Sequence, residues 1–185
     1  MNPLEVIAKY YAPGSMAYHF LVQHSRLVAR KALGIAGRIE RLKPDLGFIY
    51  EAAMLHDIGI LFTNASKIGC YGHKEYICHG YLGRELLETE GLPGHGLVCE
   101  RHVGMGITVG DIKENALPLP ERDMLPESIE EKIICFADKF FSKSEHELLQ
   151  EKPLEKVRSI VVAYGEEKLR LFDEWSRLFL DKTAP

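Results

Sequence analysis

The stretch FIYEAAMLHDIGI, residues 48–60, joins a nearly unbroken apolar segment to a histidine–aspartate pair, His56-Asp57. Asp45 stands just before it and is expected to cap a helix, and Gly59 is placed to close that helix. A helix that is apolar all round is buried in the core of a protein. The pair at its end is then buried too, where an isolated carboxylate would be costly.

The same combination of an apolar segment with a chemistry-bearing side chain recurs along the chain. His24, His79 and His102 each share a helix face with apolar residues, and Asp138 falls within the apolar run 133–141. Each one alone is most simply a core residue bonded to a carbonyl or paired with a charge. Five such segments would need five separate compensations, whereas one shared metal site would offset the desolvation of both aspartates. Imidazole and carboxylate ligands favour one or two ions of iron, manganese, zinc, cobalt or nickel over magnesium or calcium.

The apolar periodicity is helical nearly throughout, which predicts an all-α fold. Helices are expected over 3–11, from a cap at Ser15, from Asp45, and over 77–90, 95–103, 129–143, 153–164 and 166–181. Ser128-x-x-Glu131 is a capping box for the helix expected over 129–143. Residues 63–76 and 106–127 are expected to be loop or irregular, and no pair of alternating strands is seen. Without repeats or a long linker, residues 1–185 are expected to form a compact single-domain helical bundle, with a metal-site core over about 16–143 and C-terminal helices over about 153–181.

Composition excludes several classes of protein. The chain has 185 residues, 46% of them apolar, and a net charge of −4, so no general field favours a nucleic acid polymer or an anionic membrane. The sequence contains no run of about eighteen apolar residues, the length that could span a membrane. Its N-terminus lacks the pattern of a secretory signal. The four cysteines have no CxxC spacing and are expected to be reduced core residues of a cytoplasmic protein.

The ordered set His24, His56-Asp57, His79, His102 and Asp138 resembles the HD-domain metal-dependent phosphohydrolase superfamily, over about residues 16–143. The run His56-Asp57-Ile58-Gly59 resembles its HDIG branch. The resemblance implies a compact all-helical bundle in which His24, His56, Asp57 and Asp138 hold one metal ion. In binuclear members Asp57 would bridge to a second ion held by His79 and His102.

Two departures from the family pattern bear on the substrate. Ile60 stands where the HDIG branch often has lysine, and Val103 follows His102 where the HD-GYP relatives carry a further histidine in that helix. The chain also has no GYP motif. These differences weaken an assignment to cyclic-dinucleotide cleavage.

The resemblance implies a hydrolase that acts on a small phosphorylated substrate, with a nucleotide as the expected choice. It would be a phosphomonoesterase, a phosphodiesterase or a nucleotide pyrophosphohydrolase. Metal-bound hydroxide at the bridging Asp57 would attack phosphorus, and the metal ions would neutralise the phosphoryl oxygens. Lys139 and Arg101, each next to a ligand in sequence, are candidates for phosphate contact.

Two alternative functions stay open, because ligand identity alone does not fix the chemistry. The same four histidines and two aspartates resemble the HD-type di-iron oxygenases, which cleave C–C or C–P bonds. A non-catalytic regulatory module that binds a nucleotide or a metal is the third reading. The apolar face of the C-terminal helices (Leu171, Phe172, Trp175, Leu178 and Phe179) could form a homodimer, although packing on the chain's own core is the simpler expectation.

Overall fold

The structure is a computed structural model that describes residues 1–143 and 147–180. Its helices are α1 (Pro3–Tyr10), α2 (Met16–Ala36), α3 (Leu46–Leu55), α4 (His79–Thr89), α5 (Pro93–Arg101), α6 (Val109–Glu114), α7 (Ile129–Asp138), α8 (Leu154–Val161) and α9 (Glu166–Leu180). Short 3-10 turns lie between them, among them η2 (Ile58–Phe62) and η4 (Tyr76–Cys78). The strands are the two-residue antiparallel pair β1 (Asn64–Ala65) and β2 (Cys70–Tyr71). The predicted all-α class is confirmed.

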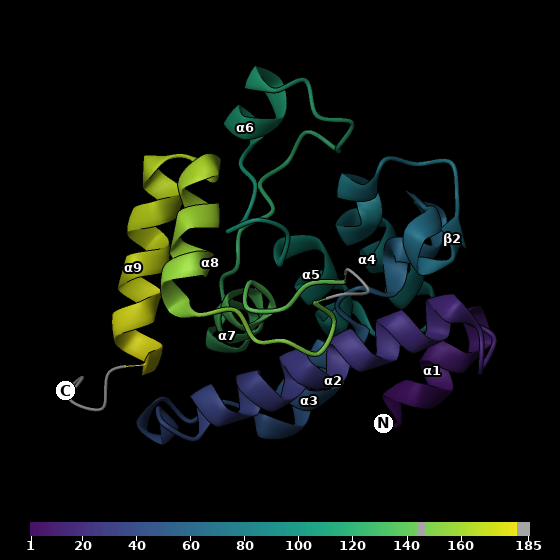
Figure 1. Ribbon diagram of the computed structural model, residues 1–185, viewed down its shortest axis with the longest axis horizontal. Helices are drawn as coiled ribbons and strands as arrows, with labels where there is room; N and C mark the ends of the chain where they lie inside the picture. Colours follow the sequence, from purple (N-terminus) through teal and green to yellow (C-terminus); the bar gives the residue numbers. More distant parts are fainter. Residues whose placement is uncertain (144–146, 181–185) are drawn as a thin grey trace.

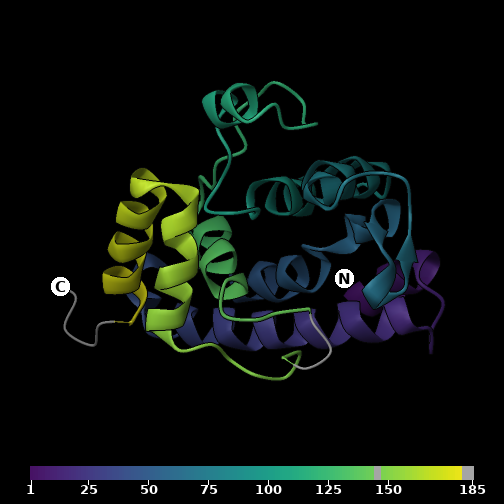
Figure 2. The ribbon, with the colours of Figure 1, turned by 45° about the horizontal axis from the view of Figure 1, so that its top comes forward.

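The long helix α2 runs along one side of the molecule, and α3 and α7 pack against it (Figures 1 and 2). Helices α4 and α5 pack on each other, and α5 also contacts α3 and α7. Helices α8 and α9 lie side by side at one end, and the segment that holds α6 projects from the body (Figure 2). No helix in the described part of the chain is both long and apolar enough to cross a membrane.

The apolar face of α9 packs on the chain's own core. Phe172 is fully buried and stacks on Phe136 of α7 with ring centroids 5.2 Å apart, and Phe179 meets the same ring edge-on. Trp175 is buried beside them. These three side chains of the predicted dimer face are therefore already covered.

Polar caps start the helices where the sequence predicts them. The side chains of Ser15, Asp45 and Ser128 each accept a hydrogen bond from a backbone N–H in the first turn of α2, α3 and α7. Each cap satisfies a donor that a helix start leaves without an intrahelical partner. The four cysteines are buried and free, as expected.

The structure differs from the prediction at the end of α7 and in the segment that holds α6. Helix α7 ends at Asp138 rather than at residue 143, and the chain continues in a turn in which Phe140 and Phe141 are still buried. Their burial kept the apolar pattern helical in appearance beyond the true end. Helix α6 lies inside the segment expected to be irregular, where Thr108 and Asp111 form a capping box. The predicted end of the last helix at residue 181 lies outside the described residues.

Gly59 does not close α3, which ends at Leu55. It lies in η2, where the backbone passes very close to α4: a Cβ at this position would be 2.1 Å from the carbonyl oxygen of His79 and 2.4 Å from the nitrogen of Gly83. Such a contact excludes any side chain. Gly59 therefore allows η2 and α4 to approach, which brings His79 beside Asp57.

Candidate metal centre

The six predicted ligands come from five helices, and most lie at a helix end. His24 is in the middle of α2, His56 is the C-cap of α3 with Asp57 next to it, His79 opens α4, His102 is the C-cap of α5, and Asp138 is the last residue of α7. All six side chains are buried. The fold thus carries residues up to 114 positions apart into one buried cluster.

Four of these side chains form a first group around one oxygen of Asp57. His24 Nε2 is 3.2 Å from Asp57 Oδ2 and 2.9 Å from Asp138 Oδ1. His56 Nε2 is 3.2 Å and 3.5 Å from the same two oxygens. The donor atoms therefore face a common centre.

The other oxygen of Asp57 belongs to a second group. Asp57 Oδ1 is 3.3 Å from His79 Nε2 and 3.4 Å from His102 Nε2. The two imidazole nitrogens are 3.2 Å apart. Asp57 thus presents one oxygen to each group.

Both groups have the dimensions of a metal site. An ion held at about 2.1 Å by two ligands at angles of about 90–110° separates the ligand atoms by about 3.0–3.4 Å. The histidine–aspartate separations given above, and the distance between His79 Nε2 and His102 Nε2, run from 2.9 Å to 3.5 Å. The donor set of imidazole and carboxylate suits a divalent transition metal. The residues therefore fit two ions bridged by Asp57.

Backbone carbonyls orient three of the histidines. The Nδ1 atoms of His56, His79 and His102 lie 2.6, 2.6 and 2.7 Å from the carbonyl oxygens of Ala53, Tyr76 and Cys99. A carbonyl can only accept, so each Nδ1 carries a proton and donates it. Each ring is thereby oriented with Nε2 directed into the cluster, the arrangement that metal-binding histidines adopt.

Several buried polar atoms have no hydrogen-bond partner among the described residues. They are His24 Nδ1, Ser25 Oγ, His56 Nε2 and both carboxylate oxygens of Asp57, none of which makes a hydrogen bond of normal geometry. Unsatisfied buried polar atoms are costly, and native proteins contain few of them. Three of the five are donor atoms of the two groups, which is what a site shaped for cations would show.

The electrostatics of the cluster also favour a cation. Burial opposes the charged forms of Asp57 and Asp138, but nearby cationic groups outweigh it and hold both carboxyl pKa values well below the usual range. Burial likewise opposes protonation of His56, yet Asp57 and Asp138 raise its pKa to about 9. Burial lowers the pKa of His102 to about 4. The two carboxylates therefore stay ionised and attract positive charge, whereas His102 stays neutral.

The two residues predicted to contact phosphate, Lys139 and Arg101, lie in different places. Lys139 lies at the cluster, where its ammonium donates to Asp138 Oδ2 at 2.9 Å and to the carbonyl of His102 at 3.1 Å. Arg101 points away and pairs with Glu131 at 3.1 Å. A third cation, which sequence reasoning missed, is Lys143, whose Nζ lies 2.7 Å from Asp57 Oδ2.

A large part of the chain matches the model of one protein family. The family model described as HD domain matches residues 21–142, about two thirds of the chain. The chain belongs to the HD domain family. No solved structure matches the chain at a significant level.

Relatives of this HD domain protein include archaeal proteins. One is a tRNA (cytidine(56)-2'-O)-methyltransferase of Thermoplasma volcanium, 28% identical over 149 residues, which are 80% of this chain and 38% of the relative. An uncharacterized protein of Methanocaldococcus jannaschii is 34% identical over 121 residues, 64% of each chain. A methyltransferase of the same description from Picrophilus torridus is 32% identical over 66% of this chain and 31% of the relative. The chain spans less than two thirds of the length of each.

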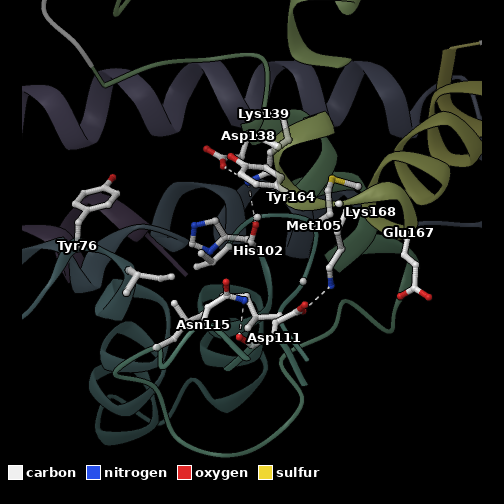
Figure 3. A pocket seen from close by; sticks show the side chains of 18 of the residues that line it. Tyr76, His102, Met105, Asp111, Asn115, Asp138, Lys139, Tyr164, Glu167 and Lys168 are labelled. Atoms are coloured by element: carbon white, nitrogen blue, oxygen red, sulfur yellow. Dashed lines mark hydrogen bonds and ion pairs between the residues drawn. The ribbon is translucent and has the colours of Figure 1, made fainter. Parts of the chain in front are cut away.

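A cleft of about 800 Å³ opens over the histidine–aspartate cluster of the HD domain. His79, His102, Asp138, Lys139 and Lys143 line its floor, and Figure 3 shows His102, Asp138 and Lys139 grouped together. The segment with α6 and the start of α9 line the other side, where Lys168 pairs with Asp111 at 3.1 Å (Figure 3). Its volume lies within the range of small-molecule sites.

Adding Mn²⁺ or Co²⁺ to metal-free HD domain protein is expected to raise its melting temperature. The ions would offset the charge of two buried carboxylates and occupy donor atoms that lack partners. At a free metal concentration about 100 times Kd, binding adds about 2.7 kcal/mol, or about 5–10 °C for a chain of this size. Differential scanning fluorimetry checks this, with Ca²⁺ as the control that should shift the melting temperature least. An equal response to all three ions would contradict a selective imidazole–carboxylate site.

Proposed function

We propose that this protein is a metal-dependent phosphohydrolase that acts on a small phosphorylated molecule, with a nucleotide as the first class to test. The observation that carries the proposal is the division of Asp57: one oxygen faces His24 and His56, and the other faces His79 and His102. Such a carboxylate can bridge two divalent ions, and paired ions suit phosphoryl transfer. Membership of the HD domain family supports the same chemistry.

The charge of the cleft floor favours an anionic substrate. At the cluster, two divalent ions and the ammonium groups of Lys139 and Lys143 would stand against the carboxylates of Asp57 and Asp138. The other acidic groups of the lining, Asp111, Glu114, Glu166 and Glu167, belong to the opposite side of the cleft. The excess of positive charge lies where the cleft reaches the cluster, so the phosphoryl end of a substrate would enter first. When bound, the ions would lower the pKa of a coordinated water and offset the charge that develops on phosphoryl oxygens.

The chain's own residues would have distinct tasks in this reaction. Asp57 would fix the spacing of the two sites, and the carbonyl-bonded histidines would keep their Nε2 atoms aimed inward. Lys139 holds Asp138 Oδ2 and so leaves Asp138 Oδ1 for the first site. The buried position of the cluster limits bulk water to the side of the cleft.

The test combines a metal count with a substrate screen. Protein purified without a chelating tag or added metal is measured by plasma mass spectrometry, then assayed for phosphate release from nucleoside monophosphates, other phosphomonoesters and dinucleotides. The proposal expects about two transition ions per chain and a hydrolysis that a chelator abolishes and Mn²⁺ or Co²⁺ restores. Iron that manganese cannot replace, with turnover that requires oxygen, would favour an HD-type oxygenase instead. Full metal content without turnover of any phosphate ester would favour a regulatory module.

A further inference from the structure

We propose that Lys143 is the residue of this chain that binds the phosphoryl group of the substrate at the first metal site, and that the substrate is a phosphomonoester. This inference rests on the proposed function. Lys143 follows the end of α7 and reaches back into the cluster, with Nζ 2.7 Å from Asp57 Oδ2 and 3.9 Å from Asp138 Oδ1. Nothing in the ligand set of the two metal groups assigns a role to this ammonium.

The route of the side chain shows that its position is built by the fold. Lys143 lines both the cleft and a small internal cavity whose other walls include Tyr11, Phe20 and Leu21. An alkyl stem can lie against apolar residues while the ammonium reaches a polar site. The side chain is 17% exposed, so the head is held in place yet open to the cleft.

A metal ion and the ammonium of Lys143 would repel each other unless an anion lay between them. Asp57 Oδ2 is an atom that the first ion would also use, so a bound ion and Lys143 Nζ would be close neighbours of like charge. Charges of the same sign a few ångströms apart repel strongly in a buried site. A phosphoryl oxygen between the ion and the ammonium turns this repulsion into two attractions, because a phosphoryl group accepts both a metal bond and a charge-assisted hydrogen bond.

Lys139 does not meet the same requirement. Its ammonium donates to the carbonyl of His102 and to Asp138 Oδ2, and the side chain is only 11% exposed. These contacts hold it in a structural position. Lys143 instead directs its charge at a carboxylate oxygen that the metal site uses, so a bound ion would compete with it for that oxygen and leave an N–H group for a ligand.

The number of cationic groups indicates the kind of ester. The residues of the two groups would hold two ions, which with Lys143 make three cationic groups at the cluster. A phosphomonoester offers three non-bridging oxygens to them. A phosphodiester offers two and carries one negative charge fewer. We therefore infer a monoester dianion as the ligand.

The experiment measures phosphate binding rather than turnover. Wild-type protein and Lys143→Met are loaded with Mn²⁺, their metal content is counted, and inorganic phosphate and dimethyl phosphate are titrated into each by calorimetry. The matched control is Lys168→Met, which removes the same charge from the side of the cleft formed by α6 and α9. Lys143→Gln, with a polar head, is the second test variant, and circular dichroism checks that each variant is folded.

The expected result is that both Lys143 variants keep their metal and bind phosphate about 10- to 100-fold more weakly, the effect of one charge-assisted hydrogen bond. Lys168→Met should bind phosphate within about threefold of wild type, because Lys168 pairs with Asp111 and, in the described part of the chain, makes no hydrogen bond or ion pair with the cluster. Dimethyl phosphate should bind all four proteins weakly.

If the metal-loaded Lys143 variants bind phosphate as tightly as wild type, the inference is wrong but the proposed function still stands. Tighter binding of the diester than of phosphate would have the same consequence. Loss of metal from these variants would make Lys143 a structural support of the metal site. Failure of metal-loaded wild type to bind phosphate would overturn the proposed function as well.

Discussion

Asp57→Ala protein is expected to lose both metal ions and to show no turnover above background, whereas His79→Ala keeps the ion of the first group. Asp57 supplies an oxygen to each group, so its removal takes a charged ligand from both at once. His79 supplies a ligand only to the second group, and His24, His56, Asp57 and Asp138 are still present without it. Metal content by plasma mass spectrometry separates the two variants directly.

The control for this pair is Asp173→Ala. Asp173 pairs with Arg158 on the surface of α8 and α9. It belongs neither to the cluster nor to the lining of the cleft. The substitution Asp173→Ala also removes one carboxylate, but from an exposed ion pair, and such pairs contribute little to stability. Full metal content and activity in Asp57→Ala would show that the ligand assignment is wrong. An equal loss of both ions in His79→Ala would show that the two groups do not bind independently.

Gly59→Ala is expected to lower the free energy of unfolding by about 3 kcal/mol or more, one of the largest effects of any single methyl group in this chain. The new Cβ would meet backbone atoms of α4 at 2.1 and 2.4 Å, and backbone cannot move aside as a flexible side chain can. Relief requires η2 and α4 to separate, which moves His79 away from Asp57. Chemical denaturation measures the first consequence. A metal count measures the second, which should affect the second group more than the first.

Gly34→Ala is the matched control on α2. A Cβ at Gly34 meets nothing within 4 Å, and the residue lies inside a regular helix. Alanine there should be neutral or stabilising by up to about 1 kcal/mol, because glycine is a poor helix former. A similar response of the two glycine variants would mean that the approach of η2 to α4 is not a constraint on the fold.

The sequence predicts the helices and the ligands because both depend on burial pattern. Apolar residues repeat at helical spacing, and polar caps such as Ser15 and Asp45 stand where the helices begin. The six candidate ligands stand out because each interrupts an otherwise apolar segment, and burial of a charge demands a partner. The structure places all six in two adjoining groups that share Asp57.

The sequence does not predict features that depend on contacts between distant segments. The role of Gly59 follows from its distance to α4, and local pattern suggested a helix end instead. Lys143 lies in an irregular turn, where no periodicity tells which way a side chain points. Arg101 precedes a ligand in sequence, but successive residues on a helix point in different directions, and it reaches Glu131. The start of α6 could have been found, since Thr108 and Asp111 have the spacing of a capping box.

The ends of α3, α5 and α7 at His56, His102 and Asp138 have a consequence that lies in the backbone alone. The peptide dipoles of a helix add up to about half a negative charge at its C-terminus. Three such ends converge on the cluster, so the peptide groups themselves favour cations there, before any side chain is counted. No side-chain substitution removes this contribution. The fold would therefore keep a cation-attracting centre even where individual ligands diverge among relatives, and a change of metal or of reaction would need only a few side chains.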